Sequence, residues 1–333
     1  ILRVAGDGST TIFHVGQTPD SPLDLVWVSD TVLAVTLTNS TPNVENKVIM
    51  YRWDETVPSL TEIDRETTGG FGAYLALHPS RRFLFADDSD FNSITSFRVN
   101  ADGTLDNVGV FFAPTFCLGP GVTPDGRFLF AGGGISSGSN KIPAFEVDQT
   151  SGALSFIGGA PFVSPGQSPK QVIGSPDSRF ALVGHGTDAT IRVFAIDQST
   201  GTLTSLGFGY DIGFQGSLGE TQFLNGFAYA TDRDTISDGV RGLQALRLEP
   251  NGELRPVGTR VDSQGVSPNQ MAVWSPPAPT CRPDLNNDGE LTFDDIAIFV
   301  GLYNANDPRA DFNSDQEWTF DDIALFVGAY NAG

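Results

Sequence analysis

Two copies of a twelve-residue acidic segment, residues 284–295 and 311–322, begin 27 positions apart near the carboxyl end of the chain. Each copy has aspartate or asparagine at its positions 1, 3, 5 and 12. Ca²⁺ is a hard cation that takes about six to eight oxygen ligands, and a loop with these side chains and a backbone carbonyl at position 7 can surround it. The sequence therefore predicts two Ca²⁺ sites. The ligands would be Asp284, Asn286, Asp288, the carbonyl of Glu290 and Asp295 in the first, and Asp311, Asn313, Asp315, the carbonyl of Glu317 and Asp322 in the second.

The two loops differ at position 6, which is Gly289 in the first and Gln316 in the second. A residue without a Cβ atom makes the tight backbone turn at this position most easily, so we expect the second site to bind Ca²⁺ more weakly. The alternative is that both segments are a solvated acidic tail without a metal. The combination of ligand spacing and apolar spacing, found twice, favours the calcium interpretation.

A segment with apolar residues at helical spacing follows each loop. These positions are Ile296, Phe299, Val300 and Tyr303 after the first loop, and Ile323, Phe326, Val327 and Tyr330 after the second. We expect two short helices that pack together through these faces. The residues before the first loop, 275–283, are rich in proline, so each unit is predicted to be a loop with one exiting helix.

Residues 281–333 resemble a dockerin, the small duplicated EF-hand-like module that attaches secreted bacterial enzymes and binding proteins to a cohesin receptor. The resemblance rests on two matched loops with duplicated helices, and it implies a cohesin-like partner. The best-known dockerins contact cohesin through a Ser-Thr type pair at loop positions 10 and 11, which here are Phe293 and Asp294, and Phe320 and Asp321. Because both copies carry the same pair, the module is predicted to be nearly two-fold symmetric and to dock in either of two orientations.

The charge of the chain points to cations rather than polyanions as partners. The formal net charge is −21, and the chain has only three lysines, Lys47, Lys141 and Lys170. This balance argues against nucleic acid or an anionic membrane as partner. No apolar run approaches the roughly 20 residues that span a bilayer. Calcium sites of this type suit a medium rich in Ca²⁺, so we expect a secreted bacterial protein whose leader has been removed.

Cys117 and Cys281 are the only cysteines, one in the body of the chain and one close to the first acidic loop. A disulfide between them and two separate buried thiols are both compatible with the sequence. Their pairing stays open at this point.

Residues 1–275 contain a repeat with a period of 46 to 52 residues. One repeated phrase is a turn followed by an alternating strand, as in HPSRRFLF from His78, TPDGRFLF from Thr123 and SPDSRFAL from Ser175. A second is F-x-V-[ND]-x-x-x-G-x-L with small variations, as in residues 97–105 and 194–203. Short alternating strands between such turns are typical of four-stranded antiparallel blades.

The sequence therefore predicts an all-β fold, a β-propeller with six visible blades and room for a seventh in the full chain. A β-sandwich is the competing all-β fold, but it would not repeat one unit at nearly constant length. The inner strands are expected near Leu25, Leu75, Val122, Val172, Phe223 and Met271. Residues 276–280 would be a proline-rich linker and residues 281–333 the small helical calcium module.

The repeat of residues 1–275 resembles the lactonase family of seven-bladed propellers, which includes bacterial 6-phosphogluconolactonase. The family's catalytic His, Glu and Arg lie on inner strands in two recognisable phrases. In the first phrase, FGAYLALHP, Tyr74 stands at the His position. In the second, Gln171 and Ile173 stand at the Glu and Arg positions, or Gly119 and Gly121 under another alignment. The expected catalytic groups are therefore replaced.

Two residues remain as candidates for catalysis. His185 lies between glycines near a loop and could face the channel, and Glu220 lies at an inner-strand position. Asp24 and Gln270 are further polar inner-strand candidates, with Arg65 and Arg233 in nearby loops, although abundant carboxylates in an acidic chain are usually solvated and a lone histidine usually packs.

The sequence thus favours a secreted modular protein whose calcium module docks to a cohesin-like receptor and whose propeller binds a carbohydrate or protein ligand at one mouth of its channel. The alternative is a lactonase or other hydrolase acting on a sugar-derived substrate. A purely structural role ranks third.

Overall fold

The computed structural model describes most of the propeller and part of the C-terminal unit. The described residues are 2–4, 10–12, 16, 18–19, 21–38, 47–54, 56–68, 74–88, 91–134, 139–212, 218–224, 226–232, 242–262, 283, 285, 291–305, 307–312 and 318–332. The chain divides into two compact units, Ile1–Ala272 and Val273–Gly333. Each is considered separately.

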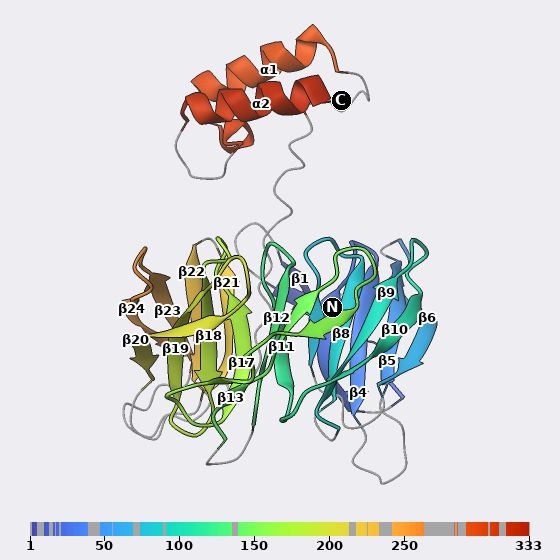
Figure 1. Cartoon of the computed structure of the whole chain (residues 1–333). Helices are drawn as coiled ribbons and strands as arrows, with labels where there is room; N and C mark the ends of the chain where they lie inside the picture. The colour runs from blue at the N-terminus through green and yellow to red at the C-terminus, as the bar shows by residue number, and fades with distance from the viewer. Residues whose placement is uncertain are drawn as a thin grey trace. The chain divides into compact units, whose positions relative to one another are not determined.

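Five antiparallel four-stranded sheets follow one another in the first unit (Figure 1). The first two are β3 (Ser21–Trp27), β4 (Val32–Thr38), β5 (Lys47–Asp54) and β6 (Ser59–Thr67), then β7 (Leu75–Leu77), β8 (Phe83–Asp88), β9 (Ser93–Val99) and β10 (Leu105–Phe112). The third is β11 (Leu118–Val122), β12 (Phe128–Gly132), β14 (Ala144–Val147) and β15 (Leu154–Phe156). The last two are β17 (Pro169–Gly174), β18 (Phe180–His185), β19 (Thr190–Ile196) and β20 (Leu203–Asp211), then β21 (Leu218–Leu224), β22 (Phe227–Asp232), β23 (Gly242–Leu248) and β24 (Leu254–Asp262).

Within every sheet the strands pair in chain order, and the first strands β3, β7, β11, β17 and β21 contact one another in that order. Each sheet is therefore a blade whose first strand is innermost, and the predicted β-propeller is confirmed. A short hairpin, β13 (Lys141–Ile142) with β16 (Phe162–Val163), adds to the third blade region.

The number of blades in the described residues is five rather than the predicted six. β1 (Leu2–Val4) and β2 (Thr10–Ile12) form a separate two-stranded pair, as expected for an incomplete blade. The inner strand predicted near Met271 lies outside the described residues, and so does the linker at 276–280. A sixth blade therefore stays a prediction.

The repeated glycine phrase forms the turn between the third and fourth strands of a blade. In the third blade, Asp148 Oδ1 accepts hydrogen bonds from the backbone N–H groups of Thr150 and Ser151, at 2.9 and 2.7 Å. Gly152 ends the turn at φ +80°, a conformation that costs residues with a Cβ atom more than glycine. The phrase D-x-x-x-G is thus local turn chemistry, and the fourth blade repeats it with Asp197 and Gly201.

Cys117 is buried between the second and third blades and carries a free thiol, whose pKa is raised by burial and by the charges of Asp87 and Asp88. This agrees with an inert packing thiol. Cys281 lies outside the described residues.

The second unit contains α1 (Phe293–Asn304), the 3₁₀ turn η1 (Pro308–Ala310) and α2 (Phe320–Ala332). Both helices begin where the loop repeat predicts. Phe299 and Phe326 stack with ring centroids 4.1 Å apart, so the predicted contact between the apolar faces is confirmed. The prediction that Val300 and Val327 pack between the helices is wrong, because these side chains are 50% and 47% exposed. Among the helices that the structure describes, none has the length and apolar character that a bilayer crossing requires.

Candidate functional site

The inner strands of the five blades each place one residue at the same level of the propeller channel. The level is set by the turn into the second strand. In four blades this channel residue lies four positions before the residue that begins the turn. The residues that begin the turns are Val28, His78, Thr123 and Ser175, and the backbone N–H of each donates to the carbonyl of the first residue of the second strand. In the fifth blade the corresponding residue is identified from the pairing of the first two strands, which shifts at the same place as in the fourth blade. The five residues are Asp24, Tyr74, Gly119, Gln171 and Glu220, which we call the channel ring.

All five residues of the channel ring line one cavity of about 310 Å³. The residues two positions further along the strands line it as well, and these are Val26, Ala76, Gly121, Ile173 and Gln222. Gln222 is the one polar side chain of this second level among the residues that the structure describes, so the carboxylates and amides lie at two adjacent levels. A cavity on which several polar groups converge is a candidate small-molecule site.

Asp24 joins the first blade to the second. Its Oδ1 accepts from the N–H of Leu25 and its Oδ2 from the N–H of Leu75 in the next blade, both at 2.8 Å. Burial raises the pKa of Asp24 to about 6, the two backbone hydrogen bonds oppose this rise, and the negative charge of Glu220 adds to it. A carboxylate with such a pKa can accept a proton near neutral pH.

Glu220 lies in a hydrogen-bonded network with two amide side chains. Its Oε1 accepts from Gln222 Nε2 at 2.7 Å and from Gln171 Nε2 at 3.2 Å. Gln171 Oε1 in turn accepts from the N–H of Thr221 at 2.8 Å, which joins the fourth blade to the fifth. The network therefore holds Glu220 and both amides at fixed positions on the cavity wall.

β-bulges set the direction of the ring side chains. The register between the first and second strands shifts between Pro22 and Asp24, between Pro169 and Gln171, and between Leu218 and Thr221. A bulge inserts an extra residue and turns the following side chains, and such bulges are frequent beside functional sites. A further shift lies between Leu118 and Gly121, so four of the five ring positions lie at one.

Gly119 and Gly121 allow the third and fourth blades to approach each other closely. A Cβ atom on Gly121 would lie 1.9 Å from the carbonyl oxygen of Val172, and one on Gly119 would lie 2.3 Å from that of Lys170. Neither position has room for an acid or a cation. Under the alternative alignment, the family's Glu and Arg would stand at these two positions. The close approach of the blades explains why neither side chain is present here.

His185 does not line the channel cavity. The expectation that it could face the channel is corrected by its place at the end of β18, where it is fully buried. Its Nε2 lies 2.7 Å from Ser164 Oγ and its Nδ1 lies 3.2 Å from the carbonyl oxygen of Thr190. Burial lowers its pKa to about 4, so the ring is neutral at pH 7 and acts as a packing residue.

The other polar candidates divide into three groups. Asp24 and Glu220 meet in the cavity, whereas Arg65 is exposed on β6 and pairs with Glu62 at 2.7 Å. Gln270 and Arg233 lie outside the described residues. Sequence reasoning missed Gln222 and the equivalence of the five ring positions, although the shared distance from the turn in four of the blades was a signal for that equivalence.

The structure describes three of the ten predicted calcium ligands, Asp295, Asp311 and Asp322. Asp295 Oδ1 accepts from the N–H of Leu285 at 2.8 Å, and Asp322 Oδ1 accepts from the N–H of Phe312 at 2.7 Å. In both copies the position 12 carboxylate is thus buried and bonded back to loop position 2. Its other oxygen accepts from the N–H of Thr292 or Thr319, at 2.9 Å in each case, and so caps the helix.

This arrangement fits a calcium ligand at position 12, because the carboxylate is drawn into the loop and each oxygen can accept in two directions. Asp311 is partly buried, next to Phe312. The remaining predicted ligands lie outside the described residues: Asp284, Asn286, Asp288, Glu290, Asn313, Asp315 and Glu317. The two metal sites stay a prediction.

The predicted partner-binding residues lie on the surface of the second unit. Phe293 and Phe320 are each 76% exposed, and Asp294 and Asp321 beside them are exposed. An apolar groove of about 470 Å³ runs between α1 and α2. Exposed aromatic residues at matching places of a duplicated unit are typical of an interaction surface.

The comparisons with known proteins concern the propeller. Residues 121–214 match the model of the seven-bladed β-propeller lactonase family. The structure is similar to a periplasmic gluconolactonase from Pseudomonas aeruginosa, with 25% identity, 81% of this chain and 80% of that chain covered, and a TM-score of 0.66. A putative 6-phosphogluconolactonase from Bacteroides fragilis has 19% identity, coverage of 82% and 80%, and a TM-score of 0.67. A search of curated protein sequences finds no match.

Proposed function

We propose that the propeller hydrolyses the lactone of a sugar-derived acid in the channel cavity. The observation that carries this proposal is the pair Asp24 and Glu220, two carboxylates on one cavity wall, of which Asp24 has a pKa of about 6. The lactonase-like fold, with a gluconolactonase among the similar structures, supports the same reaction class. Because the fold alone does not define an activity, the argument depends on the cavity.

The chemistry begins with Asp24 as general base. Its carboxylate takes a proton from a water molecule, and the water oxygen adds to the lactone carbonyl carbon. The resulting tetrahedral oxyanion needs hydrogen-bond donors, which the amide groups of Gln171 and Gln222 can supply, since each amide has two N–H bonds and donates one of them to Glu220. The ring C–O bond then breaks, the leaving oxygen receives the proton back from Asp24, and the product is the hydroxy acid.

The charge of the cavity favours an uncharged substrate. The described lining residues include two carboxylates and no lysine, arginine or histidine. A phosphorylated lactone would bring two further negative charges into this field, whereas a neutral sugar lactone meets hydroxyl-binding carboxylate and amide groups. We therefore choose glucono-δ-lactone as the first substrate to test.

The test is enzyme-dependent hydrolysis of glucono-δ-lactone by the full chain, followed in a pH-stat above the spontaneous rate. Asp24→Asn should lower kcat/KM at least about 100-fold, the usual contribution of a general base. Asp106→Asn is the matched control, because it removes an exposed carboxylate from the outer strand β10. Hydrolysis that is equal in wild type and Asp24→Asn would refute the assignment. Saturable binding of sugars without turnover would instead support a ligand-binding propeller.

We propose a second function for the C-terminal unit. It is a calcium-dependent docking module through which this protein, as a secreted protein, binds a cohesin-like receptor. The observation that favours it is the duplication of geometry, with Asp295 and Asp322 bonded identically and Phe293 and Phe320 equally exposed. Calorimetric titration of the full chain with cohesin domains, in Ca²⁺ and in EDTA, tests it. Binding that does not depend on Ca²⁺ would contradict this role.

A further inference from the structure

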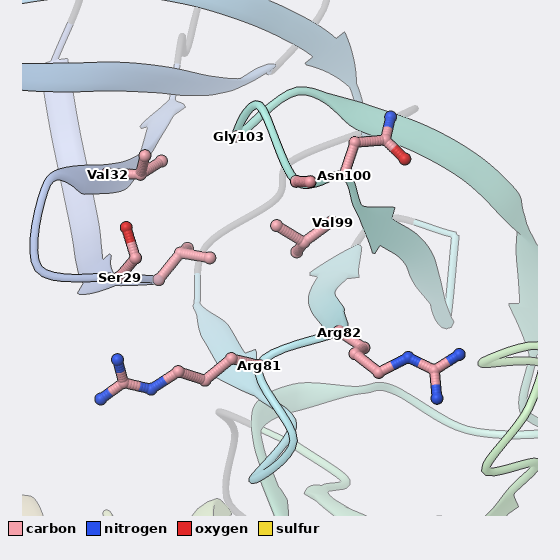
Figure 2. Close-up of a pocket in the computed structure, with 9 residues that line it drawn as sticks. Ser29, Val32, Arg81, Arg82, Val99, Asn100 and Gly103 are labelled. Atoms are coloured by element: carbon pink, nitrogen blue, oxygen red, sulfur yellow. The ribbon is translucent and has the colours of Figure 1, made fainter. Parts of the chain in front are cut away.

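A second cavity of about 430 Å³ lies at the junction of the first and second blades, on the side of the turns between their first and second strands (Figure 2). Its wall is apolar, with Val28, Val32 and Val99. Its rim carries Arg81 and Ser29. We call it the turn-side pocket. None of these residues belongs to the channel ring.

The other blade junctions are filled by a phenylalanine at the corresponding place. There the glycine of the turn between the third and fourth strands covers the first residue of the second strand of the preceding blade. A Cβ atom added to the turn glycine would lie 2.4 Å from the ring of Phe83, 2.6 Å from that of Phe128 and 3.1 Å from that of Phe180. The glycines are Gly152, Gly201 and Gly252 respectively.

At the first junction Val32 replaces this phenylalanine. The equivalence follows from the turn, because the carbonyl of Val32 accepts from the N–H of Val28 just as the carbonyl of Phe83 accepts from that of His78. Gly103 covers Val32 as the other turn glycines cover the phenylalanines, with an added Cβ 2.9 Å from the valine. The turn that contains Gly103 therefore lies where the corresponding turns lie at the other junctions. Because Val32 has no aromatic ring, the space beneath this turn is the turn-side pocket.

The cation that accompanies the ring is also missing from the first blade. The guanidinium groups of Arg82, Arg127 and Arg179 lie over the rings of the phenylalanines that follow them, with centroid distances of 5.5, 4.9 and 5.1 Å. The first blade has Thr31 at this position. The second strand of the first blade therefore begins without the phenylalanine and without the arginine that precedes it in the next three blades.

Arg81 of the second blade supplies a positive charge at the rim instead. Its φ of +57° is in the left-handed region that favours glycine, as are the φ angles of Gly126 and Ser178 at the equivalent places of the third and fourth blades. Figure 2 shows Arg81 extending along the Ser29 side of the pocket, while Arg82 turns to the opposite side. The ion pair of Arg81 with Asp30 is long, 4.0 Å, and Asp30 is 94% exposed, so it contributes little.

We propose that the turn-side pocket binds a small aromatic carboxylate. The aromatic ring occupies the place that a phenylalanine ring fills at the other junctions, against Val28, Val32 and Val99, and the carboxylate pairs with Arg81. Apolar cavities of roughly 150 Å³ hold a benzene ring, so the pocket has sufficient volume for the ring and its acid group. The guanidinium fork matches a carboxylate with two parallel hydrogen bonds.

The test uses phenylacetate as the probe and the full chain, with binding followed by saturation-transfer NMR and calorimetry. We expect one site with a Kd on the order of millimolar, and at least about tenfold weaker binding of acetate, which lacks the ring, and of benzyl alcohol, which lacks the charge. Asp24→Asn should bind phenylacetate as the wild type does, which separates this pocket from the channel. Absence of saturable phenylacetate binding would overturn the proposal.

Two variants locate the site. Val32→Phe places in the first blade the residue that the next three carry, and it should abolish phenylacetate binding while leaving the melting temperature at or above that of wild type. Arg81→Gly removes the charge at a position whose backbone favours glycine, and it should weaken binding at least about tenfold. Unchanged affinity in either folded variant would refute the assignment. Because Val32→Phe leaves the channel ring intact, lactone hydrolysis is expected to survive it.

Discussion

Asp24 on β3 and Glu220 on β21 line the same cavity, although they belong to the first and the fifth described blades. The charge of Glu220 contributes to the raised pKa of Asp24, after the larger effect of burial. The charge of one carboxylate therefore acts on the other across the channel cavity, although the two lie far apart in the sequence.

The pH dependence of lactone hydrolysis should report the state of Asp24. A general base works in its deprotonated form, so kcat/KM is expected to rise with pH through about 6 and to level off above pH 7. Hydrolysis measured from pH 4 to 8, with the spontaneous rate subtracted, checks this. If kcat/KM does not change with pH near pH 6, Asp24 is not the general base.

Glu220→Gln should move that limb to lower pH. Removing the negative charge of Glu220 removes one of the causes that raise the pKa of Asp24, and because burial is the larger cause the shift should be less than about one pH unit. The pH-rate profile of the variant measures it. Loss of activity with an unmoved limb would mean that Glu220 acts on the substrate alone. Exposed Glu146 on β14 offers the control Glu146→Gln, for which no shift is expected.

Gly121→Ala should destabilise the propeller by about 3 kcal/mol or more, because the added Cβ would lie 1.9 Å from the carbonyl oxygen of Val172 and backbone cannot yield as a side chain can. Gly158→Ala is the matched control, since no atom lies within 4 Å of its added Cβ. That variant should stay within about 0.5 kcal/mol of wild type. Urea denaturation of both variants decides the matter. Equal stabilities would show that the two blades can separate without cost.

Removal of Ca²⁺ should unfold the C-terminal unit and leave the propeller folded. Metal binding to a site that the unfolded chain lacks contributes directly to folding. Far-UV circular dichroism should lose its helical signal in EDTA while the β signal persists, and calorimetry should give two Ca²⁺ ions per chain with the first loop tighter.

Two variants separate the metal from the helix cap at the first loop. Asp295→Asn should abolish the tighter Ca²⁺ site. Thr292→Ala removes the capping side chain of α1 and costs about 1 kcal/mol, but it should keep both Ca²⁺ ions. Identical thermal melting of the wild type in Ca²⁺ and in EDTA would contradict the calcium proposal.

The duplicated aromatic residues predict redundancy in docking. Phe293→Ala or Phe320→Ala alone should retain cohesin binding, because the other copy offers the same exposed pair, whereas the double variant should lose it. Leu325→Ala, which truncates an exposed residue elsewhere on α2, is the control. Calorimetric affinities for the four proteins test the idea, and a single substitution that abolishes binding would exclude two equivalent orientations.

Much of the fold could be predicted because its signals are local. The turn phrases beginning at His78, Thr123 and Ser175 repeat the same short-range hydrogen bonds, and so do the D-x-x-x-G turns of the third and fourth blades, so one period indicates one blade. The helices after the acidic loops follow from the spacing of their apolar residues and from the capping box, whose two residues are only three positions apart. The count of blades was less certain, since a blade shared by distant parts of the chain has no local signature.

The candidate site was predictable only in part. Glu220 and Asp24 were recognised as inner-strand acids, and Tyr74 and Gln171 as replacements, each from its own phrase. Their convergence on one cavity depends on how five sheets are arranged around an axis, and pairs far apart in sequence carry no periodic signal. His185 shows the converse, because flanking glycines indicated exposure while the packing of β18 buried the ring completely.

The sequence by itself determined the elements of this protein, namely the strands, turns, helix starts and the ligand spacing of the acidic loops, because each follows from residues a few positions apart. The tertiary structure alone decided which side chains share an environment: the meeting of Asp24 with Glu220, the burial of His185 and the pocket left by Val32. Those outcomes depend on distances between blades, and burial and charge act through space rather than along the chain.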